Sequence, residues 1–208
     1  MNARIVIVEG TSGVGKSTLI DAVLRKYVFE HKKIRSLMHL TQAHTYGPLA
    51  AAEDNLTLTK EMNQSHLLQI QKMLKWSVEA VEEEHKPKFF CMIDTLHITH
   101  CVRPGVIKWA DVEACDFELH RLDCKLVFIK ATPETIWQRG IQPRRNEQFI
   151  TSYSQKFGKT PEDIHRYFIG EQERLEQLTR QSRLNTLILA AEDDFQTAVL
   201  NAYDFWLQ

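Results

Sequence analysis

The sequence predicts an α/β protein, with a doubly wound parallel sheet of about five strands and helices on both faces. Strand-like apolar segments alternate with helix-like segments along the 208 residues. The run Phe89–Ile93 is wholly apolar, which is typical of a parallel strand buried on both faces. The chain contains no internal repeat, low-complexity tract or long linker, so we expect a single domain over residues 1–208.

The expected strands are short runs rich in Val, Ile, Leu and Phe. They are Ile5–Val8, Lys33–Leu40, Phe89–Ile93, Lys125–Lys130 and Thr186–Ala190. A loop is expected over Thr41–Leu49, because this segment contains the turn residues Gly47 and Pro48.

Helices are expected where apolar residues recur at intervals of three and four. These segments are Lys16–Lys26, Lys60–Glu84, Ala110–Arg121, Pro133–Arg139, Pro161–Arg183 and Phe195–Leu207. Pro133 and Pro161 suit the first turn of a helix, where the missing backbone N–H costs nothing. An exposed apolar face on the longest helix would favour a homodimer.

Charge and apolar content exclude several kinds of partner. The 26 Lys and Arg residues are balanced by 27 Asp and Glu residues, so we expect no nucleic-acid partner. No apolar run approaches the roughly 18 residues of a membrane span, and the N-terminus shows no export signal. The cysteines lack C-x-x-C spacing and are expected to be reduced thiols of a cytoplasmic protein. They are Cys91, Cys101, Cys115 and Cys124.

A glycine-rich motif follows the first expected strand. Residues 10–18 read G-T-S-G-V-G-K-S-T and match the phosphate-binding pattern G-x-x-x-x-G-K-[ST], the P-loop. In such a loop, backbone N–H groups and a helix N-terminus surround phosphate oxygens. The alternative is a glycine-rich turn between two core elements. The residues expected to bind ATP are Gly10, Thr11, Ser12, Gly13, Val14, Gly15, Lys16, Ser17 and Thr18.

Two side chains of this motif have separate expected roles. Lys16 is expected to reach the β- and γ-phosphates and to neutralise charge during catalysis. The Ser17 hydroxyl is expected to hold Mg²⁺. The motif therefore implies ATP and Mg²⁺ as cofactors.

Asp94 directly follows the apolar run Phe89–Ile93 and should lie at the carboxyl edge of the sheet, where open α/β sheets bind their ligands. An acid there can hold Mg²⁺, directly or through water, or accept the proton of an attacking hydroxyl. We expect one of these two catalytic roles. The alternative is a carboxylate that caps the following turn.

Three arginines form a basic segment after the fourth expected strand: Arg139, Arg144 and Arg145. Guanidinium groups stabilise the charge on a phosphoryl group in transfer. Gly140 and Pro143 interrupt this segment, so we expect a lid at about residues 139–160 that carries the arginines. The alternative is a solvated loop with surface ion pairs.

These motifs resemble those of the thymidylate kinase and deoxynucleoside kinase group. Ile7–Leu19 is similar to the group's opening strand, Glu-Gly and Gly-x-Gly-Lys-[ST]-[ST]. The strand Lys125–Lys130 and the following Ala131–Arg139 are similar to its strand, Pro-Glu-Thr turn and arginine-bearing helix, and Arg144–Glu147 falls at its arginine-rich lid. The resemblance implies the nucleotide-kinase type of P-loop NTP hydrolase fold.

The chain departs from this group on the acceptor side. Leu40–Pro48 contains neither the Arg-Glu-Pro segment of thymidylate kinases nor the glutamate base of deoxynucleoside kinases. Asp94–His97 likewise lacks the Asp-Arg pair of thymidylate kinases. Asp94 as base would favour a hydroxyl acceptor, whereas Arg35 or Arg103 could clamp a phosphate from a new position. The acceptor is left open.

Four residues are expected to line the acceptor pocket: Tyr46, His97, His100 and Arg103. Tyr46 is a candidate for stacking on a base. His97 and His100 closely follow Asp94, and packing or turn roles are the alternative for both. No cysteine stands at a spacing that would complete a zinc site with these histidines, so no structural metal is expected.

Together these features predict an ATP-dependent phosphotransferase that moves the γ-phosphoryl group of Mg·ATP to a nucleoside monophosphate or a nucleoside. The alternatives are a P-loop kinase of a non-nucleotide hydroxyl and a non-catalytic nucleotide-binding regulatory module. A guanine-nucleotide switch would carry Asp-x-x-Gly and Asn-Lys-x-Asp, and neither string occurs. The donor base, adenine or guanine, stays open, as does the oligomeric state.

Overall fold

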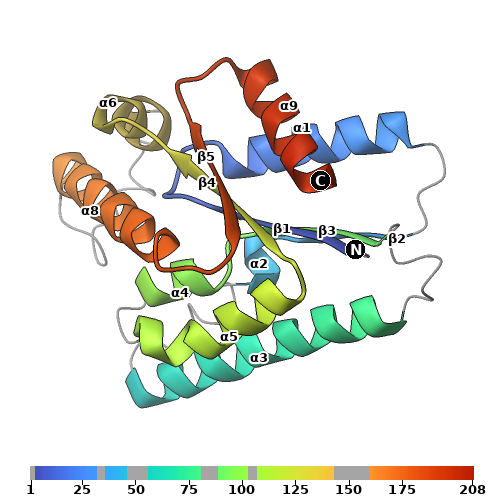
Figure 1. Ribbon diagram of the computed structural model, residues 1–208. Coiled ribbons are helices and arrows are strands. Elements are labelled where there is room, and N and C mark those ends of the chain that lie inside the picture. Colours follow the sequence, from blue (N-terminus) through green and yellow to red (C-terminus); the bar gives the residue numbers. More distant parts are fainter. Residues whose placement is uncertain (1–2, 32–35, 46–55, 81–88, 103–106, 143–159) are drawn as a thin grey trace.

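A computed structural model describes residues 3–31, 36–45, 56–80, 89–102, 107–142 and 160–208 (Figure 1). Its centre is one sheet with the strand order β2-β3-β1-β4-β5, and every neighbouring pair is parallel. The strands are β1 (Ala3–Glu9), β2 (Ser36–Leu40), β3 (Phe89–Asp94), β4 (Lys125–Lys130) and β5 (Asn185–Ala190). The predicted α/β class with a five-stranded parallel sheet is confirmed, and the strand order is compatible with a doubly wound fold.

Helices cover both faces of this sheet, as predicted. Figure 1 shows α1 and α9 on one side of the strands and α3, α4 and α5 on the other. The described helices are α1 (Lys16–Glu30), α2 (Gln42–Thr45), α3 (Leu56–Ala80), α4 (His97–Val102), α5 (Trp109–Arg121), α6 (Pro133–Thr135), the π-helical turn η3 (Ile136–Ile141), α8 (Pro161–Thr179) and α9 (Phe195–Leu207).

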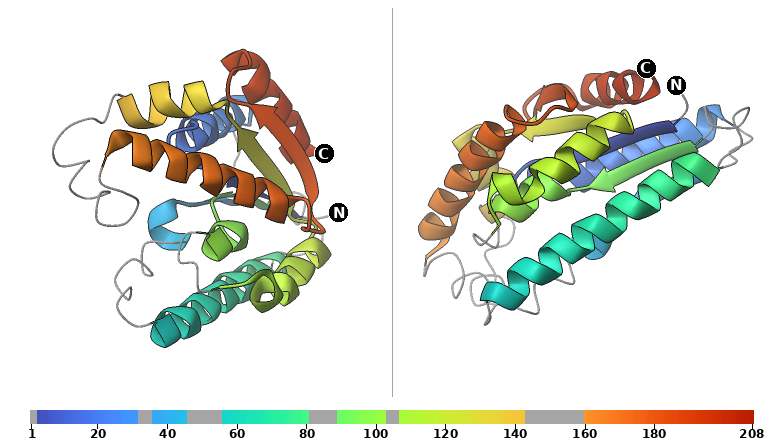
Figure 2. Two further views of the ribbon diagram at one scale, coloured as in Figure 1. Left: turned by 90° about the vertical axis from the view of Figure 1, so that its left-hand side faces the viewer. Right: turned by 60° about the horizontal axis from the view of Figure 1, so that its bottom comes forward.

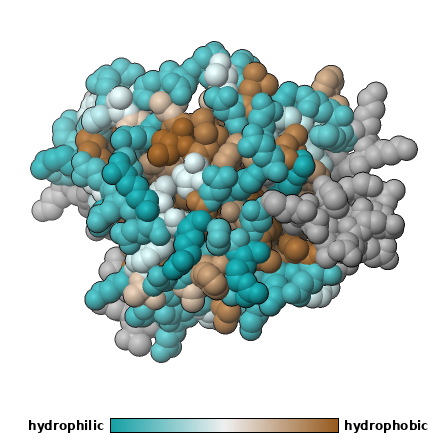
Figure 3. All heavy atoms as spheres, viewed as in Figure 1, coloured by the Kyte–Doolittle hydropathy of each residue, from teal (hydrophilic) through white to brown (hydrophobic). Residues whose placement is uncertain are grey.

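The central strands are buried because their side chains are apolar on both faces. All six residues of β3 are buried, and the register of β1 with β3 places Ile7 beside Ile93 and Val8 beside Asp94. The carboxyl ends of these two strands therefore lie next to each other. The edge strand β5 is less covered, and its Ile188 is 54 % exposed. The side of the molecule that is viewed in Figure 1 has a largely hydrophilic surface. Figure 3 shows apolar surface near the middle of that side, where Figure 1 has β5.

Two apolar layers hold the helices on the sheet. Between the sheet and α1 and α9, the ring of Tyr27 lies 4.3 Å from that of Phe90 and 5.1 Å from that of Trp206. On the opposite face, Leu74 of α3 and Leu119 of α5 are fully buried, and Figure 2 shows these two helices side by side. Burial of each such large side chain stabilises the fold by roughly 1.5–3 kcal/mol.

The helix starts agree with local capping chemistry. Thr160 accepts a hydrogen bond from the N–H of Asp163, whose carboxylate in turn accepts from the N–H of Thr160, and Pro161 occupies the first turn of α8. Asp194 accepts from the N–H of Thr197 at the start of α9. These caps explain why the predicted starts at Pro161 and Phe195 are confirmed.

Several predicted elements differ from the structure. Gln42–Thr45 forms the short helix α2, within a segment predicted as a loop, and Pro133–Ile141 is a single α-turn followed by a π-turn instead of one α-helix. The helix α8 ends at Thr179 rather than Arg183, because the chain turns there toward β5. The helix α3 begins at Leu56, four residues before the predicted Lys60.

The outer face of α3 carries exposed apolar side chains. Trp76 is 70 % exposed and Leu68 is 46 % exposed. A homodimer through this face stays a prediction. Among the described residues, no helix is both long and apolar enough to cross a membrane.

Candidate functional site

The β1–α1 loop, residues 10–15, connects the carboxyl end of the central strand β1 to the N-terminus of α1. Gly13 and Gly15 have positive φ angles of 86° and 99°, which a residue with a β-carbon adopts only with strain. Gly15 is the residue that immediately precedes α1, so the free N–H groups of the first helical turn face the loop. This loop is a preformed turn at a helix N-terminus, the geometry that favours an anion.

Lys16 folds back onto this loop. Its Nζ atom donates to the carbonyl oxygens of Gly10 and Thr11, at 2.7 Å and 3.0 Å. The side chain is only 8 % exposed. Backbone oxygens therefore hold a nearly buried ammonium group beside the loop. An incoming phosphate could attract this group away from them.

Ser17 and Asp94 meet beside the same loop. The Ser17 hydroxyl donates to Asp94 Oδ2 at 3.1 Å, and Asp94 is 5 % exposed. The other carboxylate oxygen, Asp94 Oδ1, is buried and has no hydrogen-bond partner among the described residues. A hydroxyl and a carboxylate are the ligands that Mg²⁺ takes beside phosphates, so these two residues fit a magnesium ion.

The backbone after Asp94 turns sharply. Thr95 has a φ angle of 60°, an uncommon conformation for a β-branched residue. Its N–H donates to the Val8 carbonyl at 3.0 Å, and the Thr45 hydroxyl donates to the Asp94 carbonyl at 2.9 Å. These contacts from β1 and α2 fix the direction in which the Asp94 side chain leaves the strand.

Glu9, rather than Asp94, caps the segment that follows β3. Glu9 Oε1 accepts from the N–H of Leu96 at 2.8 Å, and Glu9 Oε2 accepts from the Thr99 hydroxyl at 2.5 Å. Burial raises the pKa of Glu9, and the bonds from Thr99 and Leu96 partly offset that rise. The alternative of Asp94 as a cap finds no support among the hydrogen bonds of the described residues, because Glu9 takes that role.

Glu171 of α8 is a second acid that sequence reasoning missed. It is 1 % exposed and accepts a hydrogen bond from the Thr11 hydroxyl of the β1–α1 loop. The two residues are 160 positions apart in the chain, so no local pattern connects them. The structure thus places three acids around the loop, of which only Asp94 was predicted.

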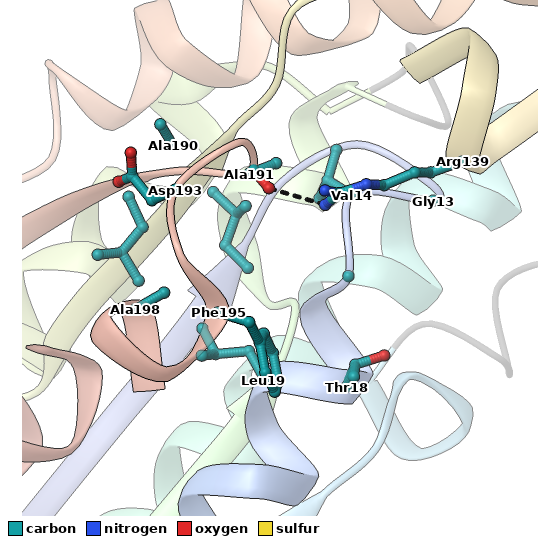
Figure 4. Close-up of a pocket in the computed structure, with 13 residues that line it drawn as sticks. Gly13, Val14, Thr18, Leu19, Arg139, Ala190, Ala191, Asp193, Phe195 and Ala198 are labelled. Carbon is teal, nitrogen blue, oxygen red and sulfur yellow. Dashed lines mark hydrogen bonds between the residues drawn. The ribbon is translucent and has the colours of Figure 1, made fainter. Parts of the chain in front are cut away.

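A pocket of about 260 Å³ opens beside the β1–α1 loop (Figure 4). Gly13, Val14, Gly15 and Thr18 of the predicted ATP-binding residues line it. Its apolar wall comes from β4, β5, α1 and α9, through Ile129, Leu189, Leu19, Phe195 and Ala198.

Arg139 lies at this pocket, where its Nη1 atom donates to the Ala191 carbonyl at 2.7 Å. Figure 4 shows the side chain reaching from the η3 segment toward the β5–α9 connection. Asp193 adds a carboxylate to the same pocket. The predicted arginine is therefore part of the pocket wall and not only a solvated loop residue.

His97 lies in a buried polar network. Its Nε2 atom is 3.0 Å from Asp116 Oδ1, and both side chains are fully buried. Asp116 also accepts from the Ser182 hydroxyl and from the N–H of Arg183. Burial alone would raise the pKa of Asp116, but these hydrogen bonds outweigh it and hold the pKa below its usual value. The network ties α4 and α5 to the α8–β5 connection.

His100 is linked to Asp94 through Thr45. Its Nε2 atom is 2.8 Å from the Thr45 carbonyl oxygen, and the Thr45 hydroxyl contacts the Asp94 carbonyl. Burial lowers the pKa of His100 to about 3, so the ring is neutral and donates to that oxygen. The ring of His66 stacks almost parallel to it at 6.4 Å.

Several predicted site residues fall outside the described part of the chain. They are Tyr46, Arg103, Arg144 and Arg145, with Arg35 and most of the expected lid, residues 143–159. Among the described residues, no group of three or more His, Cys, Asp or Glu side chains could hold a metal ion. The Ser17–Asp94 pair does not depend on such a group, since Mg²⁺ beside phosphates needs only one or two protein ligands.

Comparison of the chain with protein-family models and with curated proteins finds no match. What the chain can do is therefore inferred from the geometry of the β1–α1 loop and its neighbours.

Proposed function

We propose that the protein is a P-loop kinase that transfers the γ-phosphoryl group of Mg·ATP to a nucleoside or a nucleoside monophosphate. The observation that carries this proposal is the hydrogen bond from Ser17 to the buried carboxylate of Asp94, directly beside a glycine-rich loop and the Lys16 ammonium group. The loop and Lys16 suit phosphate, Ser17 suits a metal ion, and Asp94 suits a metal ion or a proton. These groups come together from the β1–α1 loop, α1 and β3.

The donor nucleotide would lie along the β1–α1 loop. Its phosphates would accept from the loop N–H groups and from Lys16, which would exchange its bonds to Gly10 and Thr11 for bonds to phosphate oxygens. The apolar pocket beside Phe195 and Ala198 has the character that a flat nucleobase needs. Arg139 would cover that base or its phosphates from η3.

A magnesium ion would be held by Ser17 and Asp94, and would neutralise charge on the phosphates. The Ser17–Asp94 contact already brings both oxygens into one place, so ion binding would need little reorganisation. Asp94 Oδ1 is free of protein partners among the described residues. It can therefore accept an ion-bound water or a proton without breaking a bond.

The acceptor would approach from the side of α2 and α4, beyond the carboxyl end of β3. Thr45 and His100 already form a hydrogen-bonded wall there, next to Asp94. A carboxylate with one oxygen that lacks a hydrogen-bond partner among the described residues suits a hydroxyl acceptor, because a hydroxyl must lose its proton whereas a phosphate is already anionic. Among the predicted acceptors, this geometry favours the nucleoside. The roles of Arg144 and Arg145 at the transferred group stay predictions, because both residues lie outside the described part of the chain.

The test is ADP release from Mg·ATP in a coupled assay with nucleosides, nucleoside monophosphates and hydroxylated small molecules as acceptors. Stimulation by nucleosides or their monophosphates is the expected result, and Lys16→Ala should abolish it. Stimulation by another hydroxyl compound alone would keep the kinase but overturn the proposed acceptor. ATP binding without transfer to any acceptor would favour the regulatory module.

A further inference from the structure

Consecutive residues of the β1–α1 loop contact two elements that lie far along the chain. Gly13 meets Gly140 of η3 so closely that a β-carbon built on Gly13 would lie 2.4 Å from the Gly140 Cα atom. A β-carbon built on Gly140 would lie 3.1 Å from the Ser12 carbonyl oxygen. Backbone therefore packs on backbone at this point, and it does so because both residues are glycine.

The next contact comes from α8. Glu171 accepts a hydrogen bond from the Thr11 hydroxyl, and both side chains are buried. Thr11, Ser12 and Gly13 are thus held by η3 and by α8, although neither element belongs to the phosphate-binding pattern. The remaining support comes from β4, since a β-carbon on Gly10 would lie 2.8 Å from the Ile129 carbonyl oxygen.

This loop has a geometric requirement that such contacts can meet. In the structure the loop is curled, with positive φ at Gly13 and Gly15, and successive backbone N–H groups in such a turn form a concavity that suits phosphate oxygens. A glycine-rich segment without support would lose much conformational entropy when it adopts that shape around a ligand. External contacts that fix the shape beforehand reduce the cost of binding.

We infer that Gly140 and Glu171 are positioning residues of the donor site, which hold the β1–α1 loop in the shape that binds a nucleoside triphosphate. This inference rests on the proposed nucleotide binding but needs no particular acceptor. Neither residue touches the ligand in this account. Gly140 acts by leaving room for Ser12 and Gly13, and Glu171 acts by fixing the Thr11 hydroxyl.

The competing explanation is ordinary packing, in which both residues stabilise the fold without any effect on the ligand. The two explanations differ in one measurable respect. Loss of packing lowers the melting temperature and leaves the affinity of the folded protein for nucleotide unchanged. Loss of loop positioning weakens nucleotide binding even where the melting temperature hardly moves.

The chain offers a matched control for each residue. Gly170 lies on α8 with no atom within 4 Å of a β-carbon built on it, so Gly170→Ala adds the same methyl group in open space. Glu173 lies two residues beyond Glu171 on the exposed side of α8. Glu173→Ala therefore removes an equivalent carboxylate that has no contact with the loop.

The experiment is isothermal titration of the full chain with Mg·ATP and Mg·ADP, with a thermal melt of each variant. We expect Gly140→Ala to weaken binding several-fold, because the added β-carbon lies so close to the Ser12 carbonyl oxygen that the loop backbone must shift by a few tenths of an ångström. Glu171→Ala should weaken it as well, and Glu171→Gln, which keeps an acceptor for Thr11, should restore much of the affinity. Gly170→Ala and Glu173→Ala should bind as the unaltered protein does.

The outcomes separate the two proposals. If the unaltered protein binds nucleotide and both Gly140→Ala and Glu171→Ala bind equally well, the positioning role is wrong and the proposed function stands. If the unaltered protein binds no nucleotide, the proposed function fails together with the inference. Should Gly140→Ala fail to fold, Glu171→Ala and Glu171→Gln still decide the matter.

Discussion

The Ser17 hydroxyl lies 3.1 Å from Asp94 Oδ2, although 77 residues separate the two in the chain. Ser17 belongs to the first turn of α1, and Asp94 is the last residue of β3. The parallel pairing of β1 with β3 creates this contact, because Val8 and Asp94 share one register position. Any change that shifts this register would separate the two oxygens that are proposed to hold Mg²⁺.

Lys16→Ala is expected to abolish phosphoryl transfer and to weaken Mg·ATP binding by on the order of a hundredfold. The variant loses the ammonium group that lies against the loop, while the apolar core is untouched. Steady-state kinetics and titration calorimetry measure the effect. Lys72→Ala, on the exposed side of α3, is the control and should behave as the unaltered protein. Near-normal turnover of Lys16→Ala would contradict the role given to this residue.

Asp94→Asn is expected to reduce turnover by roughly two to four orders of magnitude, with little loss of stability. Asparagine keeps the shape and can still accept from Ser17, but it carries no charge for a metal ion or a proton. A titration with Mg²⁺ distinguishes the two roles. Higher Mg²⁺ would rescue a metal ligand and would not rescue a base. Turnover that stays normal while the protein becomes less stable would reduce Asp94 to a structural residue.

His100 should make the protein less stable in acid. Its pKa is lowered by burial from 6.5 to about 3, so the unfolded chain takes up a proton below pH 6.5 that the folded protein does not. The contribution of His100 to the free energy of unfolding is fully present above pH 6.5. It falls as the pH decreases toward 3, by at most about 1.4 kcal/mol per pH unit for one proton.

Urea unfolding between pH 7 and pH 4 tests this dependence. His100→Gln keeps a donor for the Thr45 carbonyl without a titrating ring, and should flatten the curve of the free energy of unfolding against pH. His120→Gln, on the exposed side of α5, should not change it. Parallel curves for the unaltered protein and His100→Gln would show that His100 is protonated in the folded protein as easily as in the unfolded chain.

The cysteines should be unreactive in the folded protein. Burial raises the pKa of Cys91, Cys101 and Cys115 to about 12, and that of Cys124 well above its ordinary value. Because the thiolate is the reactive form, a thiol reagent at pH 8 should label these four side chains slowly before denaturation and completely after it. Mass spectrometry of the labelled protein counts the sites. Rapid labelling of Cys91 or Cys124 without denaturant would contradict the buried positions.

Local patterns were sufficient to predict the strands and most helices. β4 (Lys125–Lys130) and α9 (Phe195–Leu207) agree with the predicted bounds, because an apolar run and a capped amphipathic segment are both local features. The helix α2 was missed because it spans only four residues and is held by contacts with other elements, such as the bond from Thr45 to Asp94.

The site residues also divide into those that a local sequence pattern predicts and those that only tertiary packing brings to the site. Lys16, Ser17 and Asp94 were placed together because the motif and the end of an apolar strand are visible in the sequence. Glu9 gave a weak signal, as an acid at the end of an apolar strand. Glu171 gave none, since its contact with Thr11 exists only once α8 has packed beside the loop.

The contact of α9 with β1 has a consequence for how the protein is made. The indole N–H of Trp206 donates to the Arg4 carbonyl across 202 residues, and β1 lies in the sheet between β3 and β4. The glycine-rich loop is synthesised early, yet the strand that carries it can neither pair fully nor be covered until β4 and then α9 have left the ribosome. Until then the apolar side chains of β1 stay incompletely covered, and a nascent chain stalled before Phe195 should not retain nucleotide.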